Sequence, residues 1–214
     1  MSKKILCIGD SFTFGEELPH PNTQSWPSLL ASANNWNVNN MGKSGASNDR
    51  SVRILFDEID NNYDLIILSW TTYLRFEVFN VKSNTPVSLA PKTFMEHGAY
   101  WAKSFYGDWC NNLFLYKRML TQIIQTQSYL KLINQPYIFS MAFNVYPDSS
   151  FSEFKSLLNK IDTSLFFQWP NTLNSIVEGL PRGINGHPLN QGHQKIATEM
   201  NNFIHNVLPS FKTE

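Results

Sequence analysis

Short apolar runs alternate along the chain with longer stretches in which apolar residues recur every three or four positions. The runs predict buried strands, of which the second and the last are the weaker candidates, over residues 4–8, 37–41, 64–68, 137–143 and 165–167. The longer stretches predict amphipathic helices, one beginning near Ser25 and the others over residues 48–59, 108–132, 151–161 and 190–207. Strands that alternate with helices favour a parallel sheet covered on both faces. The predicted fold class is therefore α/β.

The segment from about residue 70 to residue 106 has no clean helical or strand period. Proline and glycine interrupt it, and aromatic residues are frequent within it. It is too long for a plain loop inside a compact domain. We therefore expect a single domain over residues 1–214, with an aromatic-rich insertion or lid at about 70–106.

The amino-acid composition limits which binding partners and which cellular location we expect. The 214 residues are 42% hydrophobic and 16% charged, with 17 Lys+Arg against 17 Asp+Glu, which is a globular composition without net charge. No basic run marks a nucleic-acid or anionic membrane surface, so neither partner is expected. The first apolar run is too short for a signal peptide, and no stretch approaches the roughly 20 apolar residues of a membrane span. We expect a cytoplasmic or phage-particle protein.

Candidate chemistry lies at the end of the first predicted strand. Ser11 follows that strand directly, and sites in parallel sheets form outside the carboxyl ends of the strands. A serine hydroxyl is a weak nucleophile until a neighbouring base removes its proton. Such a base is available in His187, which stands in a Gly- and Asn-rich loop before the last predicted helix. The backbone N–H groups of the turn at Ser11 can help to bind a developing oxyanion.

Four short motifs in order along the chain resemble those of the SGNH/GDSL hydrolase family. They are Gly-Asp-Ser at residues 9–11, Trp-Pro at 26–27, the Asn-to-Gly segment 40–45, and His-Pro followed by Gly-His within 187–193. The resemblance covers nearly the whole chain. It implies a three-layer α/β/α sandwich with a parallel, flavodoxin-like sheet, and hydrolysis of carboxylic esters without a metal or cofactor.

The resemblance also implies roles for individual residues. Ser11 matches the nucleophile and also contributes its backbone N–H to the oxyanion, and His187 matches the general base. The second family motif supplies a glycine N–H to the oxyanion. Gly45 matches that glycine best, and Gly42 is the second choice.

The third family motif departs from its usual form. The family places an Asn after the central strand as an oxyanion donor, whereas this chain continues with Trp70, Thr71 and Thr72. The hydroxyl of Thr71 or Thr72 is the expected substitute, and Asn48 is an alternative. Loss of one such donor costs roughly two to three orders of magnitude in rate.

The acidic residue of the family's catalytic triad also differs from the usual pattern. The family places an Asp two or three residues before the histidine, where this chain has Asn185 and Ile184. We expect Asn185 to orient the imidazole, although an amide cannot stabilise an imidazolium as a carboxylate does. The alternatives are a Ser-His dyad, a backbone carbonyl, or a carboxylate from another loop, with Asp148 and Asp162 nearest in sequence.

Trp70, Tyr73 and Arg75 lie where the third motif should face the site, and we expect them to contact substrate. The purely structural alternative for Arg75 is a surface ion pair with Glu77. The aromatic insertion favours a small-molecule or glycan ester, such as an O-acetylated carbohydrate. The sequence leaves the oligomeric state open.

Two other functions compete with ester hydrolysis. A carbohydrate-binding module on the same fold would explain the missing Asn and Asp as decayed catalysis. A flavodoxin-like flavin protein would use residues 11–13 as a phosphate loop, but it would leave the His-Pro motif unexplained, and fold alone does not decide function.

Overall fold

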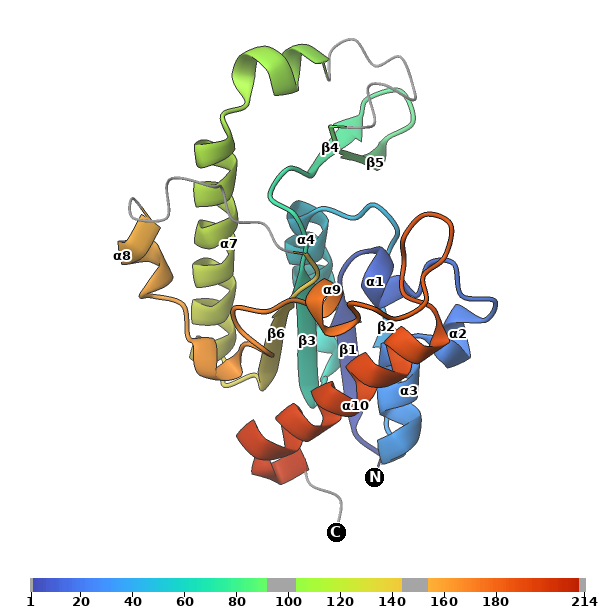
Figure 1. Cartoon of the computed structure of the whole chain (residues 1–214). Helices are drawn as coiled ribbons and strands as arrows, with labels where there is room; N and C mark the ends of the chain where they lie inside the picture. The colour runs from blue at the N-terminus through green and yellow to red at the C-terminus, as the bar shows by residue number, and fades with distance from the viewer. Residues whose placement is uncertain (1, 92–102, 144–153, 212–214) are drawn as a thin grey trace.

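Four parallel strands form the central sheet of the protein, whose computed structural model describes residues 2–91, 103–143 and 154–211. The strand order is β2-β1-β3-β6 (Figure 1). The strands are β1 Lys4–Ile8, β2 Asn37–Asn40, β3 Leu65–Trp70 and β6 Tyr137–Met141. The four longer predicted strands are therefore confirmed. The shorter candidate at 165–167 forms a single bridge, between Phe166 and Phe139.

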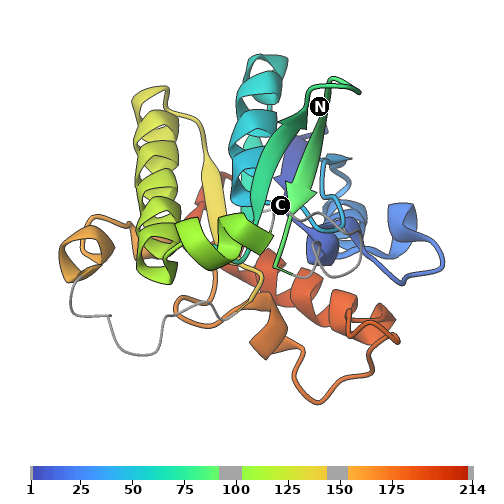
Figure 2. The same ribbon diagram turned by 90° about the horizontal axis from the view of Figure 1, so that it is seen from above.

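Alternate side chains of the strands face opposite layers of helices. Leu6 and Ile8 of β1 belong to a buried cluster with α4, Asn48–Glu58, and α7, Asn112–Leu132. Ile5 and Cys7 belong to a second cluster with α3, Trp26–Asn34, and α10, Asn190–Val207. Viewed from above, α4 and α7 lie on one side of the sheet and α10 on the other (Figure 2). The predicted three-layer α/β/α sandwich is confirmed.

Local capping explains where the main helices begin. Ser25 is the N-cap of α3 and Pro27 lies in its first turn, as predicted, but the Ser25 hydroxyl pairs with Ser28 Oγ at 3.1 Å rather than with a backbone N–H. The helix α7 begins four residues later than predicted. Its N-cap is Asn111, whose side chain accepts a hydrogen bond from the backbone of Leu113, because Phe105–Trp109 form a separate π-helical turn.

The remaining elements are short. They comprise α1 Ser11–Phe14, α2 Pro21–Gln24, α8 Lys155–Leu158, α9 Leu173–Ile176 and the 3₁₀ turns Ile59–Asn61, Thr163–Leu165 and Pro209–Phe211. The helix predicted over 151–161 is α-helical only in α8, and its first three residues lie outside the described residues. The helix α10 has the predicted bounds.

The insertion contains an antiparallel hairpin of β4, Phe76–Asn80, and β5, Thr85–Leu89. Together with α1 and the loop before α10, the hairpin lies at the carboxyl end of the central strands (Figure 1). The base of the insertion is fixed by the Tyr106 hydroxyl, which donates to the carbonyl oxygen of Leu74 at 2.7 Å. Its role as a lid stays a prediction.

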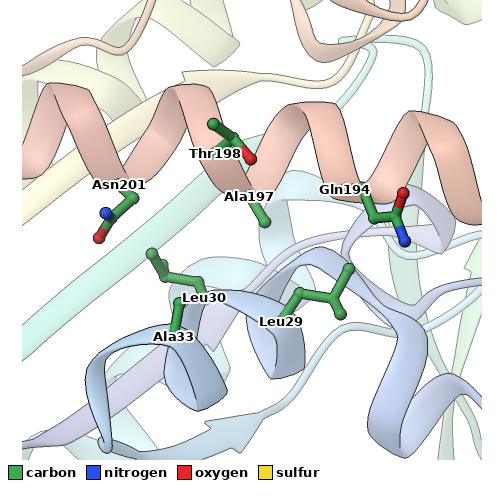
Figure 3. Close-up of a pocket in the computed structure, with 7 residues that line it drawn as sticks. All are labelled: Leu29, Leu30, Ala33, Gln194, Ala197, Thr198 and Asn201. Atoms are coloured by element: carbon green, nitrogen blue, oxygen red, sulfur yellow. The ribbon is translucent and has the colours of Figure 1, made fainter.

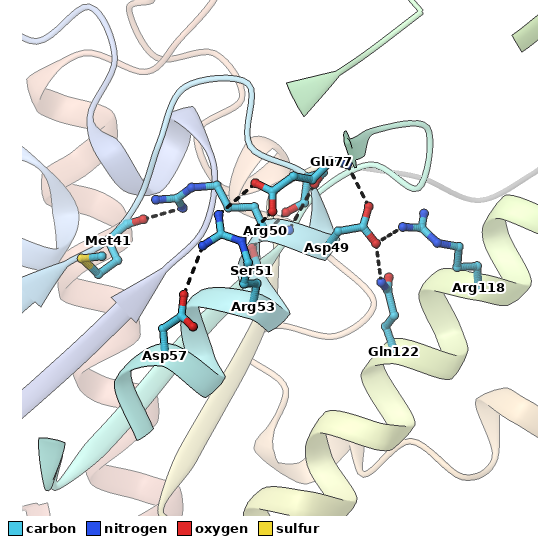
Figure 4. A network of polar contacts seen from close by, with 10 residues as sticks. Met41, Asp49, Arg50, Ser51, Arg53, Asp57, Glu77, Arg118 and Gln122 are labelled. Atoms are coloured by element: carbon cyan, nitrogen blue, oxygen red, sulfur yellow. Dashed lines mark hydrogen bonds and ion pairs between the residues drawn. The ribbon is translucent and has the colours of Figure 1, made fainter. Parts of the chain in front are cut away.

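A polar network joins the hairpin to two helices (Figure 4). Asp49 of α4 accepts hydrogen bonds from the backbone of Glu77 at 3.0 Å, from Gln122 Nε2 at 2.9 Å, and from Arg118. The Glu77 carboxylate in turn accepts two bonds from Arg53, at 2.7 and 3.0 Å. The start of β4 is therefore fixed to both α4 and α7.

Across the described parts of the chain, none of the helices has the length and apolar character that crossing a membrane requires.

Candidate active site

The turn between β1 and α1 presents Ser11 at the carboxyl end of the sheet. Asp10 is the N-cap of α1, and its Oδ1 accepts a hydrogen bond from the backbone of Phe12 at 3.0 Å. Ser11 is thus the first residue of the short helix, and only 2% of it is exposed. The predicted nucleophile lies in a tight, capped turn after a buried strand.

Asp10 is fully buried and connects the turn to the loops after β3 and β2. Its Oδ2 accepts hydrogen bonds from Thr71 Oγ1 at 2.6 Å and from Arg75 Nη1 at 3.1 Å. The same Nη1 donates to the carbonyl oxygen of Ala46 at 3.2 Å. The loops after β1, β2 and β3 are therefore joined through the ion pair of Asp10 with Arg75.

The two candidate oxyanion glycines have different surroundings. A Cβ on Gly42 would lie 2.5 Å from the backbone nitrogen of Phe14, so this glycine is required for close packing against α1. Gly45 has a φ of +69° and open space where a Cβ would stand. Its position beside Ala46 places it next to the residue that Arg75 contacts. The Gly42 N–H already donates to Asn40 Oδ1 at 3.0 Å, which favours Gly45 over Gly42 as a donor to substrate.

The substitutes for the missing Asn are not equivalent. The Thr71 hydroxyl already donates to Asp10, so its hydrogen is not available to a substrate oxygen. The Asn48 side chain pairs with both backbone groups of Thr71, at 3.1 and 2.8 Å, and therefore stabilises the end of β3. Thr72 Oγ1 accepts a bond from the backbone of Leu74 at 3.3 Å, which leaves its hydrogen for another acceptor. Thr72 is the better of the two predicted threonines.

The loop before α10 brings His187 to the nucleophile turn. The imidazole packs against the Phe12 ring at a centroid distance of 6.2 Å, with the two planes at 61°. Its Nδ1 lies 2.8 Å from Glu17 Oε2. The loop is closed on itself, because Arg182 donates to the carbonyl oxygen of Gly186 at 2.8 Å. His187 is thus held beside the residue that follows Ser11.

The Glu17 carboxylate, rather than Asn185, contacts the imidazole. Asn185 donates its backbone N–H to Glu17 Oε1 at 2.9 Å, and its side-chain amide lies 3.4 Å from the same oxygen. The backbone of His187 donates to Oε2 at 3.2 Å. The hydrogen bonds from Asn185, and then those from His187, hold the pKa of Glu17 below its ordinary value. The expectation that Asn185 orients the imidazole directly is therefore wrong in this geometry.

The other predicted acids lie elsewhere. Asp162 binds Lys131 at 2.5 Å and accepts a hydrogen bond from Ser164, so its carboxylate is engaged with residues other than His187. Asp148 lies outside the described residues. Sequence reasoning missed Glu17 because its contact with His187 spans 170 residues. Its closeness to Ser11 in sequence was the one feature that could have indicated it.

Of the residues predicted to contact substrate, Trp70 lies in the core, whereas Tyr73 and Arg75 are only partly buried. Trp70 is fully buried and packs edge-on against Phe139 at 5.4 Å, so it is a core residue and the expectation for it is wrong. Tyr73 is half-buried, with its ring 5.8 Å from that of Tyr116. The surface pair of Arg75 with Glu77 is not formed, since Arg75 pairs with Asp10 and Glu77 with Arg53.

A separate hollow of about 270 Å³ lies between α3 and α10 (Figure 3). It is lined by Leu29, Leu30 and Ala33 on one helix and by Gln194, Ala197, Thr198 and Asn201 on the other. None of the predicted site residues lines it. Within the described ranges, His, Cys, Asp and Glu form no group of three or more that could hold a metal ion.

No protein-family model matches the sequence, and no curated protein matches it either. Solved structures do match the fold. The acetyl xylan esterase Est2A from Butyrivibrio proteoclasticus is 18% identical over 97% of this chain and 65% of that one, with a TM-score of 0.58. The acetylxylan esterase Axe2 from Geobacillus stearothermophilus, solved as a catalytic mutant, is 14% identical over 100% and 99% of the two chains, with a TM-score of 0.54.

A third match is a structure described as a putative lipolytic protein of the G-D-S-L family from Desulfitobacterium hafniense DCB-2. It is 15% identical over 94% of this chain and 99% of that one, with a TM-score of 0.53. The resemblance to the SGNH/GDSL hydrolases is therefore confirmed at the level of the fold.

Proposed function

We propose that the protein is a serine esterase that hydrolyses a carboxylic ester with Ser11 as nucleophile and His187 as general base. One observation supports this most: the fold brings the His187 imidazole, from the far end of the chain, against the short helix that Ser11 begins. A serine at a strand end needs such a base to become a nucleophile. The likeness in fold to known esterases supports the same reaction class.

In the first half of the reaction, Ser11 Oγ attacks the ester carbonyl carbon while its proton passes to His187 Nε2. The carbonyl oxygen becomes an oxyanion, for which the backbone N–H groups of Ser11 and Gly45 are the donors, with the Thr72 hydroxyl as a third. The carbon–oxygen bond to the alcohol then breaks. The leaving oxygen takes the proton from His187, and an acyl group remains on Ser11.

In the second half, water takes the place of the alcohol. His187 removes a proton from the water, whose oxygen attacks the acyl carbon. The tetrahedral intermediate collapses with release of the carboxylic acid, and Ser11 Oγ recovers its proton from His187. No step requires an oxidant, a reductant or a metal ion.

The substrate class proposed here is an O-acetylated carbohydrate. Two of the matching structures are acetyl xylan esterases by description. Tyr73 and Arg75, on the loop that follows β3, are the proposed substrate contacts. Trp70 is not part of this proposal because it is buried.

Hydrolysis of p-nitrophenyl acetate, p-nitrophenyl butyrate and acetylated xylan tests the proposal. We expect kcat/KM to fall by about 10³-fold or more in Ser11→Ala and in His187→Ala. Ser32→Ala and His20→Ala change exposed residues of the same types and serve as matched controls. Activity that is absent from the parent, together with acetylated-xylan affinity that survives in Ser11→Ala, would favour the carbohydrate-binding module instead.

A further inference from the structure

We propose that Glu17 is the acidic member of the catalytic triad and acts as a positioning residue for His187. This inference rests on the proposed esterase function and adds to it. In the family pattern the acid precedes the histidine by two or three residues, and catalytic mutants of the G. stearothermophilus esterase replace an Asp and a His three residues apart. This chain has Ile184 at that distance, with its side chain 98% exposed.

The contact with the imidazole has the geometry that a triad acid requires. Glu17 Oε2 lies 2.8 Å from His187 Nδ1, and the side chains are only 12% and 18% exposed. An ionised carboxylate is an acceptor only, so Nδ1 carries the hydrogen and donates it. The second ring nitrogen, Nε2, is then left without a hydrogen and can accept the proton of Ser11.

The Glu17 carboxylate is itself held by the loop before α10, which carries His187. Oε1 accepts from the backbone and side chain of Asn185, while Oε2 accepts from the backbone of His187 as well as from its ring. These donors favour the ionised form of Glu17, and they keep one oxygen aimed at Nδ1. Asn185 therefore acts through Glu17, which accounts for an amide at a position where the family resemblance suggests an acid.

Gly183 packs closely against the same carboxylate. A Cβ on Gly183 would lie 2.5–2.6 Å from the carboxyl carbon and both carboxyl oxygens of Glu17. Only glycine leaves this space for the carboxylate. Because Glu17 follows Ser11 by six positions, acid and nucleophile lie on one short segment, against which the histidine loop docks.

Glu17→Gln is the first test, since it keeps the shape of the side chain but removes the charge. We expect kcat to fall about 10²- to 10⁴-fold while KM stays within about threefold, because the imidazolium formed in the transition state loses its carboxylate. The acidic limb of the pH profile of kcat/KM should also move to lower pH. Glu16→Gln removes a neighbouring charge and should leave kcat and the profile unchanged.

Gly183→Ala is a second, independent test that substitutes none of Ser11, Glu17 and His187. The added methyl displaces the Glu17 carboxylate, so we expect kcat to fall. The decrease in log kcat should be about one tenth to one half of the decrease caused by Glu17→Gln. Gly107→Ala is the matched control, because nothing lies within 4 Å of its added Cβ.

A measurement without substrate separates this inference from the proposed function. In NMR spectra the Nδ1 proton of His187 should appear as a strongly downfield signal in the parent and in Ser11→Ala, and it should be absent from Glu17→Gln. Parent-like kcat, pH profile and Nδ1 signal in Glu17→Gln would overturn the role of Glu17. If Ser11→Ala still lost activity, the esterase function would stand.

Discussion

Arg75 illustrates how the fold gives a partner to a side chain that we predicted to contact substrate. Its Nη1 lies 3.1 Å from Asp10 Oδ2 and 3.2 Å from the carbonyl oxygen of Ala46. One cation thus contacts the residue before Ser11 and the residue after Gly45. Asp10 is fully buried, and a buried carboxylate without a cation is strongly unfavourable. Arg75 therefore stabilises the nucleophile turn, and substrate contact by its remaining surface stays a prediction.

Substitution of Arg75 by Met tests this role, because it keeps much of the aliphatic volume and removes the cation. The Asp10 carboxylate is left buried without its ion-pair partner, so we expect the free energy of unfolding to fall by about 3 kcal/mol in urea titrations at pH 7. Lys131→Met is the control, since the Lys131–Asp162 pair is 48% and 29% exposed and its loss should cost under about 1 kcal/mol. Equal losses in the two variants would contradict the role of Arg75.

At the scale of elements, Asp49 is the residue where α4, β4 and α7 meet. It lies in the first turn of α4, where a negative charge interacts favourably with the helix dipole. One of its oxygens accepts from the backbone of Glu77 and the other from Gln122 and Arg118 (Figure 4). These hydrogen bonds hold the base of the hairpin against α4 and α7. The hairpin is therefore expected to move as a unit with α4 and α7.

Asp49→Ala removes these contacts together. We expect the free energy of unfolding to fall by about 2 kcal/mol, because charged hydrogen bonds are lost. Hydrogen exchange should quicken at Glu77 and through residues 76–89, as measured by mass spectrometry. Asp57→Ala is the control, since Asp57 is 57% exposed and its ion pair with Arg53 is a surface pair within one helix. Parent-like exchange in Asp49→Ala would mean that other contacts hold the hairpin.

At the scale of the whole molecule, a buried histidine couples folding to pH. His193 is fully buried, and its Nδ1 accepts a hydrogen bond from the backbone of Trp26 at 3.1 Å, which joins α10 to α3. Burial, and then the neighbouring charge of His187, lowers the pKa of His193 from 6.5 to about 4. Between these values the unfolded chain binds a proton that the folded chain does not. Stability is therefore lost as the pH falls through this window.

We expect the free energy of unfolding to fall by up to about 3 kcal/mol between pH 6.5 and pH 4, in urea titrations across that range. The lowered pKa of Glu17 adds a loss in the same direction toward the acidic end of the range. His193→Gln removes the histidine titration and should flatten the slope between pH 6.5 and pH 5. The same slope in parent and variant would show that other groups determine the acid response.

Much of the fold could be predicted because hydrophobic periodicity is a local property of the chain. The bounds of β1 and α10 match the sequence prediction. The strand β1 is a continuous apolar run, and in α10 the apolar residues recur at helical spacing, so both patterns can be recognised locally. The start of α7 was placed too early because the residues just before Asn112 fit both a helix and the separate turn to which they contribute. Propensity alone does not separate the two.

For the candidate site, the sequence by itself determined where Ser11 and His187 stand: one after a buried strand and the other in a loop before an amphipathic helix. Only the tertiary structure decided that Glu17 meets His187 across 170 residues, and that Trp70 faces the core. The physical reason is that strands and helices follow from the spacing of neighbouring side chains. A hydrogen bond between two loops depends instead on how the whole sheet brings their ends together.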